Sequence, residues 1–158
     1  IDCIAGPRGI APTEDRLAGY HRALSEAGGS GAVVYGDFQV ESGYEAFKQM
    51  YDSGDMPGAV FVSNDLMAIG VLHGAAEQRM RVPYELSVVG FDDIQLSRYA
   101  VPPLTTVRQP RREMASTAIE LLLDRAQGTR TGAAERRVLT PELVVRESTG
   151  WPGSGQAM

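Results

Sequence analysis

Residues 86–93, with the sequence Leu-Ser-Val-Val-Gly-Phe-Asp-Asp, decide the fold class of this 158-residue chain. An apolar run leads through Gly90 and ends in two adjacent acids, and no residue of the run before Asp92 is charged. Strands buried on both faces of a parallel sheet are apolar in this continuous way. The segment therefore predicts a buried strand that carries two carboxylates to the open edge of a sheet.

Other segments repeat this pattern, since residues 58–62 are apolar and lead to Asn64 and Asp65. Strands and helices alternate four times along the chain, which predicts an α/β fold with a mainly parallel sheet and helices on both faces. We expect residues 138–139 and 143–145 to form a hairpin or two edge strands. Strands are also expected at 1–7, 32–35 and 104–107, and helices at 13–27, 42–54, 64–79 and 111–126.

Polar residues at the starts of three predicted helices are candidate N-caps. These residues are Thr13, Ser42 and either Asn64 or Asp65. The helix at 64–79 is apolar nearly all round, so we expect one of its faces on the sheet and another on a second subunit. Its glycines, at positions 70 and 74, would let that neighbour approach closely.

Composition excludes several functional classes. The net charge of −5 argues against duplex DNA binding by this chain alone. No apolar run is long enough to span a membrane, and no export signal is visible. Cys3 is the single cysteine, and the two histidines lack partners at the spacing of a metal site or a catalytic triad. We therefore expect no cofactor, no metal site and no enzymatic activity.

The carboxyl ends of the predicted strands define a candidate ligand site, because ligands of such sheets bind beyond these ends. Phe38, Asn64 and Asp92 follow three of the strands, and Arg16 lies near the start of the first helix. Arginine donates in pairs, aspartate accepts in pairs, and asparagine does both, which suits the vicinal hydroxyls of a sugar. An aromatic ring stacks on the apolar face of a pyranose or a base.

Each candidate has a structural alternative. Asp65 and Asn64 also suit helix caps, Phe38 suits the core, and Arg16 suits a surface ion pair. For Asp93 we expect a structural hydrogen bond or a cap, and not a ligand contact. The cluster Arg108, Arg111 and Arg112 suits a solvated helix face better than a nucleic-acid or phosphate site.

Several motifs, in this order and spacing, resemble the C-terminal part of LacI/GalR-family transcriptional regulators. They cover nearly all of residues 1–150. The motifs are Ile-Ala-Gly-Pro at 4–7, Arg-Leu-Ala-Gly-Tyr at 16–20, Gly-Asp-Phe at 36–38, Glu-Ser-Gly-Tyr at 41–44, Ser-Asn-Asp-Leu-Met-Ala-Ile-Gly at 63–70, Val-Pro at 82–83, residues 86–93, Pro-Pro-Leu-Thr-Thr-Val at 102–107 and Leu-Val-Val-Arg-Glu-Ser-Thr at 143–149.

The resemblance implies the second lobe of a type I periplasmic-binding-protein-like fold, with an effector in the cleft between two lobes. It implies that Arg16, Phe38, Asn64 and Asp92 contact a sugar or nucleoside effector. The expected homodimer surface includes the third helix and residues 95–101. Its named members are Met67, Gly70, Val71, Gly74, Leu96 and Tyr99.

The resemblance also implies a domain organisation. We expect the lobe to span 1–150, with a crossover segment at about 105–130 that packs on an absent first lobe, and a disordered tail at 151–158. The chain is then a fragment that lacks the helix-turn-helix, so DNA is reached only through the absent N-terminal domain. In this fragment we expect the helix at 111–126 to pack on a second copy, with exchanged segments.

Two readings of the function remain. The first is an effector-sensing and dimerisation lobe of a cytoplasmic, LacI/GalR-like, sugar-responsive regulator. The alternative is a lobe of an exported sugar-binding protein of a transport system. The segment at 102–107 and the ending at 143–149 resemble the regulators more closely than the exported proteins.

Overall fold

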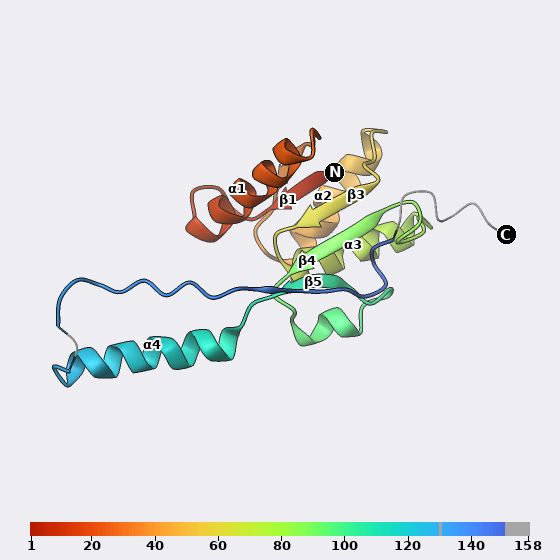
Figure 1. Ribbon diagram of the computed structural model, residues 1–158. Helices are drawn as coiled ribbons and strands as arrows, with labels where there is room; N and C mark the ends of the chain where they lie inside the picture. Colours follow the sequence, from red (N-terminus) through yellow and green to blue (C-terminus); the bar gives the residue numbers. More distant parts are fainter. Residues whose placement is uncertain (130, 151–158) are drawn as a thin grey trace.

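The computed structural model describes residues 1–129 and 131–150. A six-stranded sheet forms its centre, with the strand order β2-β1-β3-β4-β5-β6 (Figure 1). Strands β1 to β5 pair in parallel, and β6 runs antiparallel to β5, so the predicted fold class is confirmed. The strands are β1 (Asp2–Ala5), β2 (Val33–Tyr35), β3 (Ala59–Val62), β4 (Ser87–Phe91), β5 (Thr105–Arg108) and β6 (Glu142–Val144). The helices are α1 (Ala11–Glu26), α2 (Val40–Asp52), α3 (Asp65–Glu77), the 3-10 helix η1 (Gln95–Arg98) and α4 (Arg111–Ala126).

The two faces of the sheet have separate cores, because successive side chains of a strand point to opposite faces. Ile4 of β1 belongs to the larger core, which the sheet shares with α2 and α3. Cys3 and Ala5 point the other way and pack against Leu17 and Tyr20 of α1. Helices therefore cover both faces, as predicted, with α1 alone on one of them (Figure 1).

Close packing between α2 and α3 depends on glycine. A Cβ atom on Gly70 would lie 2.0 Å from the carbonyl oxygen of Val40, and one on Gly43 would lie 2.0 Å from that of Met67. Gly74 faces an aromatic ring of α2 in the same way. The expectation that the glycines of α3 admit a second subunit is therefore wrong, because α2 already occupies the space beside them.

The structure corrects two of the predicted helix starts. Helix α1 begins two residues before Thr13, which is fully buried and does not cap the helix. Helix α2 begins two residues before Ser42, whose Oγ instead accepts a hydrogen bond from the backbone N–H of Asp37. At α3 the prediction for Asn64 is confirmed, since its Oδ1 accepts the backbone N–H of Met67 at 2.9 Å.

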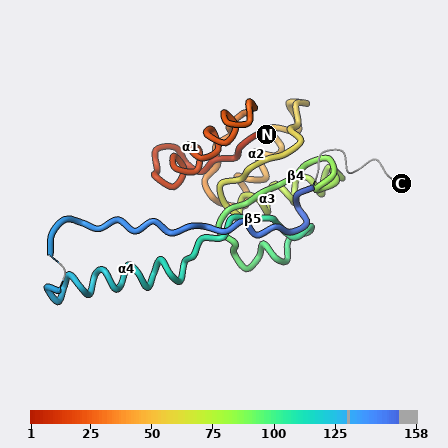
Figure 2. Tube along the Cα trace, viewed as in Figure 1, coloured from red at the N-terminus to blue at the C-terminus, as the bar shows by residue number. Residues whose placement is uncertain are grey.

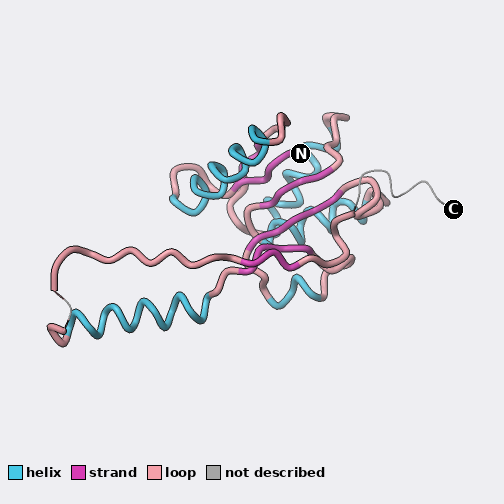
Figure 3. Tube along the Cα trace, viewed as in Figure 1, coloured by secondary structure: helices cyan, strands magenta, loops and turns pink. Residues whose placement is uncertain are grey.

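Helix α4 and the segment 131–141 extend from the sheet as an arm, which we call the crossover arm (Figures 1 and 2). No residue of α4 is buried. The chain leaves the sheet through β5 and returns through β6, with Thr106 opposite Val144 and Arg108 opposite Glu142. Residues 138–139 are not a strand, because they run beside α4 without strand pairing (Figure 3). The tail expected to be disordered lies outside the described residues.

Candidate functional site

The four predicted contact residues lie together at the carboxyl edge of the sheet. Arg16 is at their centre, with Nη2 3.5 Å from Oδ1 of Asp92 and Nη1 donating to the carbonyl oxygen of Ser63 at 2.8 Å. Its guanidinium carbon lies 5.8 Å from the ring centre of Phe38. Asn64 donates from Nδ2 to the carbonyl oxygen of Phe38 at 2.8 Å. The structure therefore joins all four residues in one cluster.

The Arg16 guanidinium lies between aromatic rings and is largely shielded from solvent. Its central carbon is 4.1 Å from the ring centre of Phe91, which is within cation–π range. Burial lowers the pKa of Arg16, and the nearby Asp92 carboxylate opposes that shift. Because arginine keeps its proton in proteins, the group stays charged and presents a planar set of donors.

Gln109 is a member of the cluster that the sequence analysis missed. Its Nε2 donates to Oδ1 of Asp92 at 2.6 Å, so this oxygen faces both Gln109 and Arg16. A signal for Gln109 was present, because it directly follows β5 and so occupies a strand end, as Asp92 does after β4. Phe91 was missed because its position in the sequence predicts only the last apolar residue of a buried strand.

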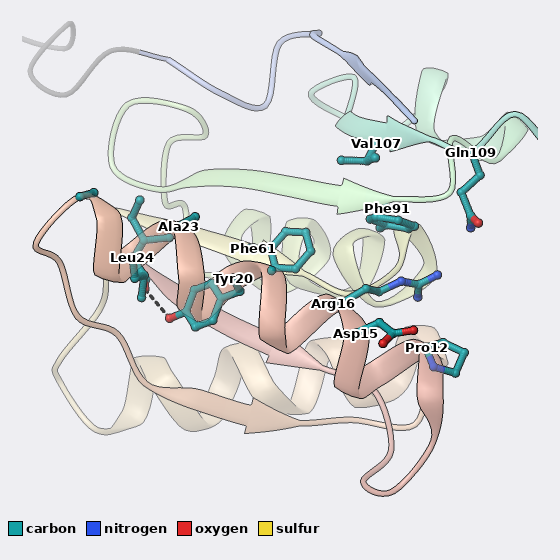
Figure 4. A pocket seen from close by; sticks show the side chains of 13 residues that line it. Pro12, Asp15, Arg16, Tyr20, Ala23, Leu24, Phe61, Phe91, Val107 and Gln109 are labelled. Atoms are coloured by element: carbon teal, nitrogen blue, oxygen red, sulfur yellow. Dashed lines mark hydrogen bonds between the residues drawn. The ribbon is translucent and has the colours of Figure 1, made fainter. Parts of the chain in front are cut away.

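A hollow of about 760 Å³ runs from this cluster along the α1 face of the sheet (Figure 4). Arg16 and Gln109 lie at one end of it, and Tyr20 lies at the other, where its hydroxyl donates to the carbonyl oxygen of Ile1 at 2.7 Å. Apolar side chains from β3, β4 and β5 form its floor. These are Phe61, Phe91 and Val107. The site therefore combines a polar end with an apolar wall.

The turn after β4 has an unusual backbone. Asp92 and Asp93 have φ angles of 115° and 50°, and Phe38 has a φ of 70°. Residues other than glycine adopt such angles at an energetic cost, and such conformations persist where the surroundings hold them. They cluster at ligand sites, and two of the four such residues in the described part of the chain, Phe38 and Asp92, are predicted contact residues.

Asp93 has the structural role that the sequence analysis expected. Its carboxylate accepts from Arg108 Nε at 2.7 Å and from Arg146 Nη2 at 2.5 Å. Burial alone would raise the pKa of Asp93, but these two hydrogen bonds outweigh it and lower the pKa to about 2. Arg111 donates to the backbone carbonyl of Asp93 at 3.1 Å. Arg108 and Arg111 therefore bind this turn, while Arg111 and Arg112 are exposed at the start of α4, in agreement with the prediction of a solvated face.

Asp65 is neither a helix cap nor a ligand contact. It is fully buried, and its carboxylate accepts the backbone N–H of Ile94 and the hydroxyl of Thr106. Burial raises its pKa, while these two hydrogen bonds act against the shift. Both expectations for Asp65 are therefore wrong, because its oxygens are used beneath the site.

The residues predicted for a dimer surface fall into two groups. Four of the six are buried inside the chain, where α2 and the sheet cover them, so their assignment to a surface is wrong. Leu96 and Tyr99 are 57% and 73% exposed, and their role stays a prediction. The four buried residues are Met67, Gly70, Val71 and Gly74.

Within the part of the chain that the structure describes, no group of three or more His, Cys, Asp or Glu residues is placed to hold a metal ion. Cys3 is fully buried, and burial raises its pKa to about 12, so it is a neutral thiol. None of the described helices is long and apolar enough to cross a membrane.

Comparison with known proteins identifies the family. A model of the periplasmic binding protein-like domain matches residues 1–149, and the chain belongs to this family. The repressor CytR of Escherichia coli K12 is 42% identical over 152 residues, which are 94% of this chain and 44% of that protein. The ribose operon repressor of the same strain is 39% identical over 151 residues, or 94% of this chain and 46% of that protein.

Solved structures of LacI-type regulators have the same fold. A dimeric Lac repressor with an 11-residue C-terminal deletion matches with a TM-score of 0.91 and 35% identity, over 96% of this chain and 56% of that one. A complex of the regulator CelR with cellobiose matches with a TM-score of 0.87 and 39% identity, over 93% and 46%. The chain resembles their effector-binding domains and spans about half the length of these relatives.

Proposed function

We propose that the chain is the second lobe of the effector-binding domain of a LacI-type transcriptional repressor. Its effector contacts are Arg16, Phe38, Asn64 and Asp92, with Gln109 as a fifth. The observation that carries this proposal is the convergence of an arginine, a carboxylate, two amides and an aromatic ring at one edge of the sheet. This set pairs with vicinal hydroxyl groups and stacks on the apolar face of a ring.

The proposed effector class is a sugar, alone or as part of a nucleoside. Among the relatives, one is a ribose operon repressor and another was solved with cellobiose. The matching relatives are transcriptional repressors, which supports regulation over transport and over enzymatic function. With a net charge of −5, this lobe leaves DNA contact to another part of the longer protein, in the cytoplasm.

Nuclear magnetic resonance of the ¹⁵N-labelled chain tests the proposed effector class. The side-chain amides of Asn64 and Gln109 and the Nε–H of Arg16 give separate signals that report directly on the cluster. Ribose, cellobiose and adenosine are titrated in turn, and we expect weak, saturable shifts of these three signals. An Arg16→Met variant should lose the response, because it removes the donor group and retains an apolar chain.

The outcomes distinguish the effector classes. Shifts with ribose or cellobiose support a free sugar as the effector, and shifts with adenosine alone narrow the proposed class to a nucleoside. If none of the compounds moves the three signals at its highest soluble concentration, the proposed site is wrong. Galactitol serves as an open-chain control, because it presents hydroxyls but no ring face for Phe38.

We also propose that residues 95–101 form a surface for a second copy of the chain. Leu96, Tyr99 and Val101 are 57%, 73% and 85% exposed and follow one another closely after the Asp92 turn. An exposed apolar patch of this kind marks an interaction site. The Lac repressor structure that matches this chain is dimeric.

The crossover arm requires a partner as well. Ile119, Leu122 and Leu123 of α4 are 58%, 68% and 51% exposed. In the longer protein we propose that this face packs on the first lobe, and in the isolated chain on a second copy. Packing on either partner would remove the same apolar surface of α4 from water.

A further inference from the structure

Two buried side chains, Asp65 and Thr106, bind the underside of the turn that carries Asp92. Oδ2 of Asp65 accepts the backbone N–H of Ile94 at 2.8 Å. Oδ1 of Asp65 accepts the hydroxyl of Thr106 at 2.5 Å, and the same hydroxyl oxygen accepts the backbone N–H of Asp93 at 3.4 Å. The two N–H groups that follow Asp92 are therefore both held from below.

These two side chains are closed off from any effector. Asp65 and Thr106 have no exposed surface. Gly90 of β4 leaves room for the carboxylate, because a Cβ atom there would lie 2.4 Å from Oδ1 of Asp65. Asp65 is also the first residue of α3, where the helix dipole favours a negative charge. The pair can act on an effector only through the turn above it.

The turn needs such support because of its backbone angles. The φ angles of Asp92 and Asp93 are 115° and 50°, in regions that persist only when neighbouring groups hold them. The backbone N–H of Asp92 is tied to the carbonyl of Val107 at 2.8 Å, which anchors the near end of the turn. The far end is anchored by Asp65 and Thr106, since the next two N–H groups end on them.

We propose that Asp65 and Thr106 are positioning residues for the effector carboxylate of Asp92. They hold the turn in the conformation that presents the carboxylate to Arg16 and Gln109. Without the Thr106 hydroxyl, the turn relaxes and Asp92 moves away from both partners. The inference rests on the proposed function in one respect only, which is that Asp92 contacts an effector.

The test begins without a ligand, on the labelled 158-residue chain. Thr106→Val removes the hydroxyl at nearly constant shape, and Thr106→Ser retains it. We expect the amide of Asp93 to exchange about tenfold faster in Thr106→Val, which corresponds to the loss of one hydrogen bond. The side-chain amide signal of Gln109 should move toward that of a solvent-exposed glutamine. Thr106→Ser should keep both properties of the wild type.

The matched control is the adjacent threonine of the same strand. Thr105 is 2% exposed, and its hydroxyl accepts the backbone N–H of Arg146 and bonds to the hydroxyl of Thr149. Thr105→Val therefore removes a comparable buried hydroxyl, which has no bond to the turn itself and is connected to it only through Arg146, the partner of Asp93. We expect the Gln109 signal to be unchanged in this variant. Equal effects of the two valine substitutions on Gln109 would overturn the proposal, because Thr106 would then be a general structural residue.

Asp65→Asn decides the question if Thr106→Val does not fold. The amide keeps one acceptor oxygen for Ile94 and loses the second acceptor, which binds the hydroxyl of Thr106 in the wild type. We expect the Gln109 signal to move in the same direction as for Thr106→Val. A folded Asp65→Asn variant with the wild-type Gln109 signal contradicts the proposal.

A ligand arm separates this proposal from the proposed function. Whichever of ribose, cellobiose or adenosine shifts the wild-type signals is titrated into both valine variants. We expect about tenfold weaker binding in Thr106→Val and unchanged binding in Thr105→Val. Equal affinities in the two variants would overturn the positioning role. If none of the three compounds binds the wild type, the proposed function fails, and the ligand-free signals still decide whether Asp65 and Thr106 position Asp92.

Discussion

Asp92 and Asp93 are neighbours in sequence, but their carboxylates lie in different surroundings. Asp92 contacts Arg16 and Gln109, with a side chain that is 25% exposed. Asp93 is 4% exposed and is held by Arg108 and Arg146. The two adjacent carboxylates therefore have different partners. One is available to a ligand and the other joins β4 to β5 and the C-terminal segment.

Asp93→Asn should lower stability and flatten its dependence on acid. At pH 7 the variant should lose about 3 kcal/mol, because Arg146 is left without its carboxylate. The pKa of Asp93 is about 2 in the folded chain, below its unfolded value. Ionised Asp93 therefore stabilises the wild type above pH ~4, and about 2 kcal/mol of this is lost as pH falls toward 2. Urea unfolding between pH 7 and pH 2 measures both effects.

The wild type is compared with the Asp93→Asn variant because Asp65, which both contain, has the opposite effect on stability in acid. Burial raises the pKa of Asp65, so its protonation in acid favours the folded state. Glu85→Gln is the control, since Glu85 forms an exposed pair with Arg81. A wild type and an Asp93→Asn variant with parallel stability curves between pH 4 and pH 2 would contradict the assigned ion pairs.

The sequence predicted most of the site, because strand ends follow from the apolar pattern. Strand ends predict Phe38, Asn64 and Asp92, and Arg16 is predicted from its place near the start of the first helix. Gln109 follows the same rule, but its strand is short and carries two threonines and an arginine, so it was not treated as a site strand. The role of Asp65 was not predictable, because a helix cap and a buried acceptor have the same local sequence.

At the level of elements, the α2–α3 contact depends on glycines whose neighbours the sequence does not reveal. Gly70→Ala should lower the free energy of unfolding by about 2 kcal/mol or more, because its Cβ would meet the backbone of Val40 at 2.0 Å. Gly19→Ala in α1 is the matched control, since no atom lies within 4 Å of its added Cβ. It should raise stability by about 0.5–1 kcal/mol. Thermal or urea unfolding of both variants measures the difference.

Equal effects of Gly70→Ala and Gly19→Ala would contradict the packing of α2 on α3. The sequence predicts that α3 is apolar nearly all round, but the neighbour expected on one of its faces was a second chain, where the structure has α2. Periodicity shows how much of a helix is apolar, and it does not show which neighbour covers each face. The order of strands and helices was more predictable, because alternation alone favours a parallel sheet.

For the whole molecule, we expect the isolated chain to self-associate in solution. Sedimentation equilibrium should show a dimer or larger species at micromolar concentration. Leu96→Arg with Tyr99→Arg should shift the equilibrium toward monomer, because charge replaces the exposed apolar surface. Tyr84→Arg is the control, since Tyr84 is 55% exposed on a different loop. A wild-type chain that sediments as a pure monomer would contradict this prediction.

A second pair of substitutions tests the crossover arm separately. Leu122→Lys with Leu123→Lys removes apolar surface from α4 and leaves residues 95–101 unchanged. If the arm packs on a second copy, this double variant should also weaken self-association. If only the Leu96 and Tyr99 substitutions have an effect, the arm takes no part in the interface of the isolated chain.

The pairing of β5 with β6 determines how the crossover arm can move. Strand β5 leads into the arm and β6 returns from it. The two strands are hydrogen-bonded neighbours, with three residues of β5 opposite three of β6. Sliding β5 past β6 would break this pairing, whereas bending both strands together would preserve it. The crossover arm can therefore bend as one unit about the β5–β6 pair. Arg108 is the last residue of β5, at the base of the arm, and its bonds to Asp93 and Glu142 join this base to the carboxylate turn.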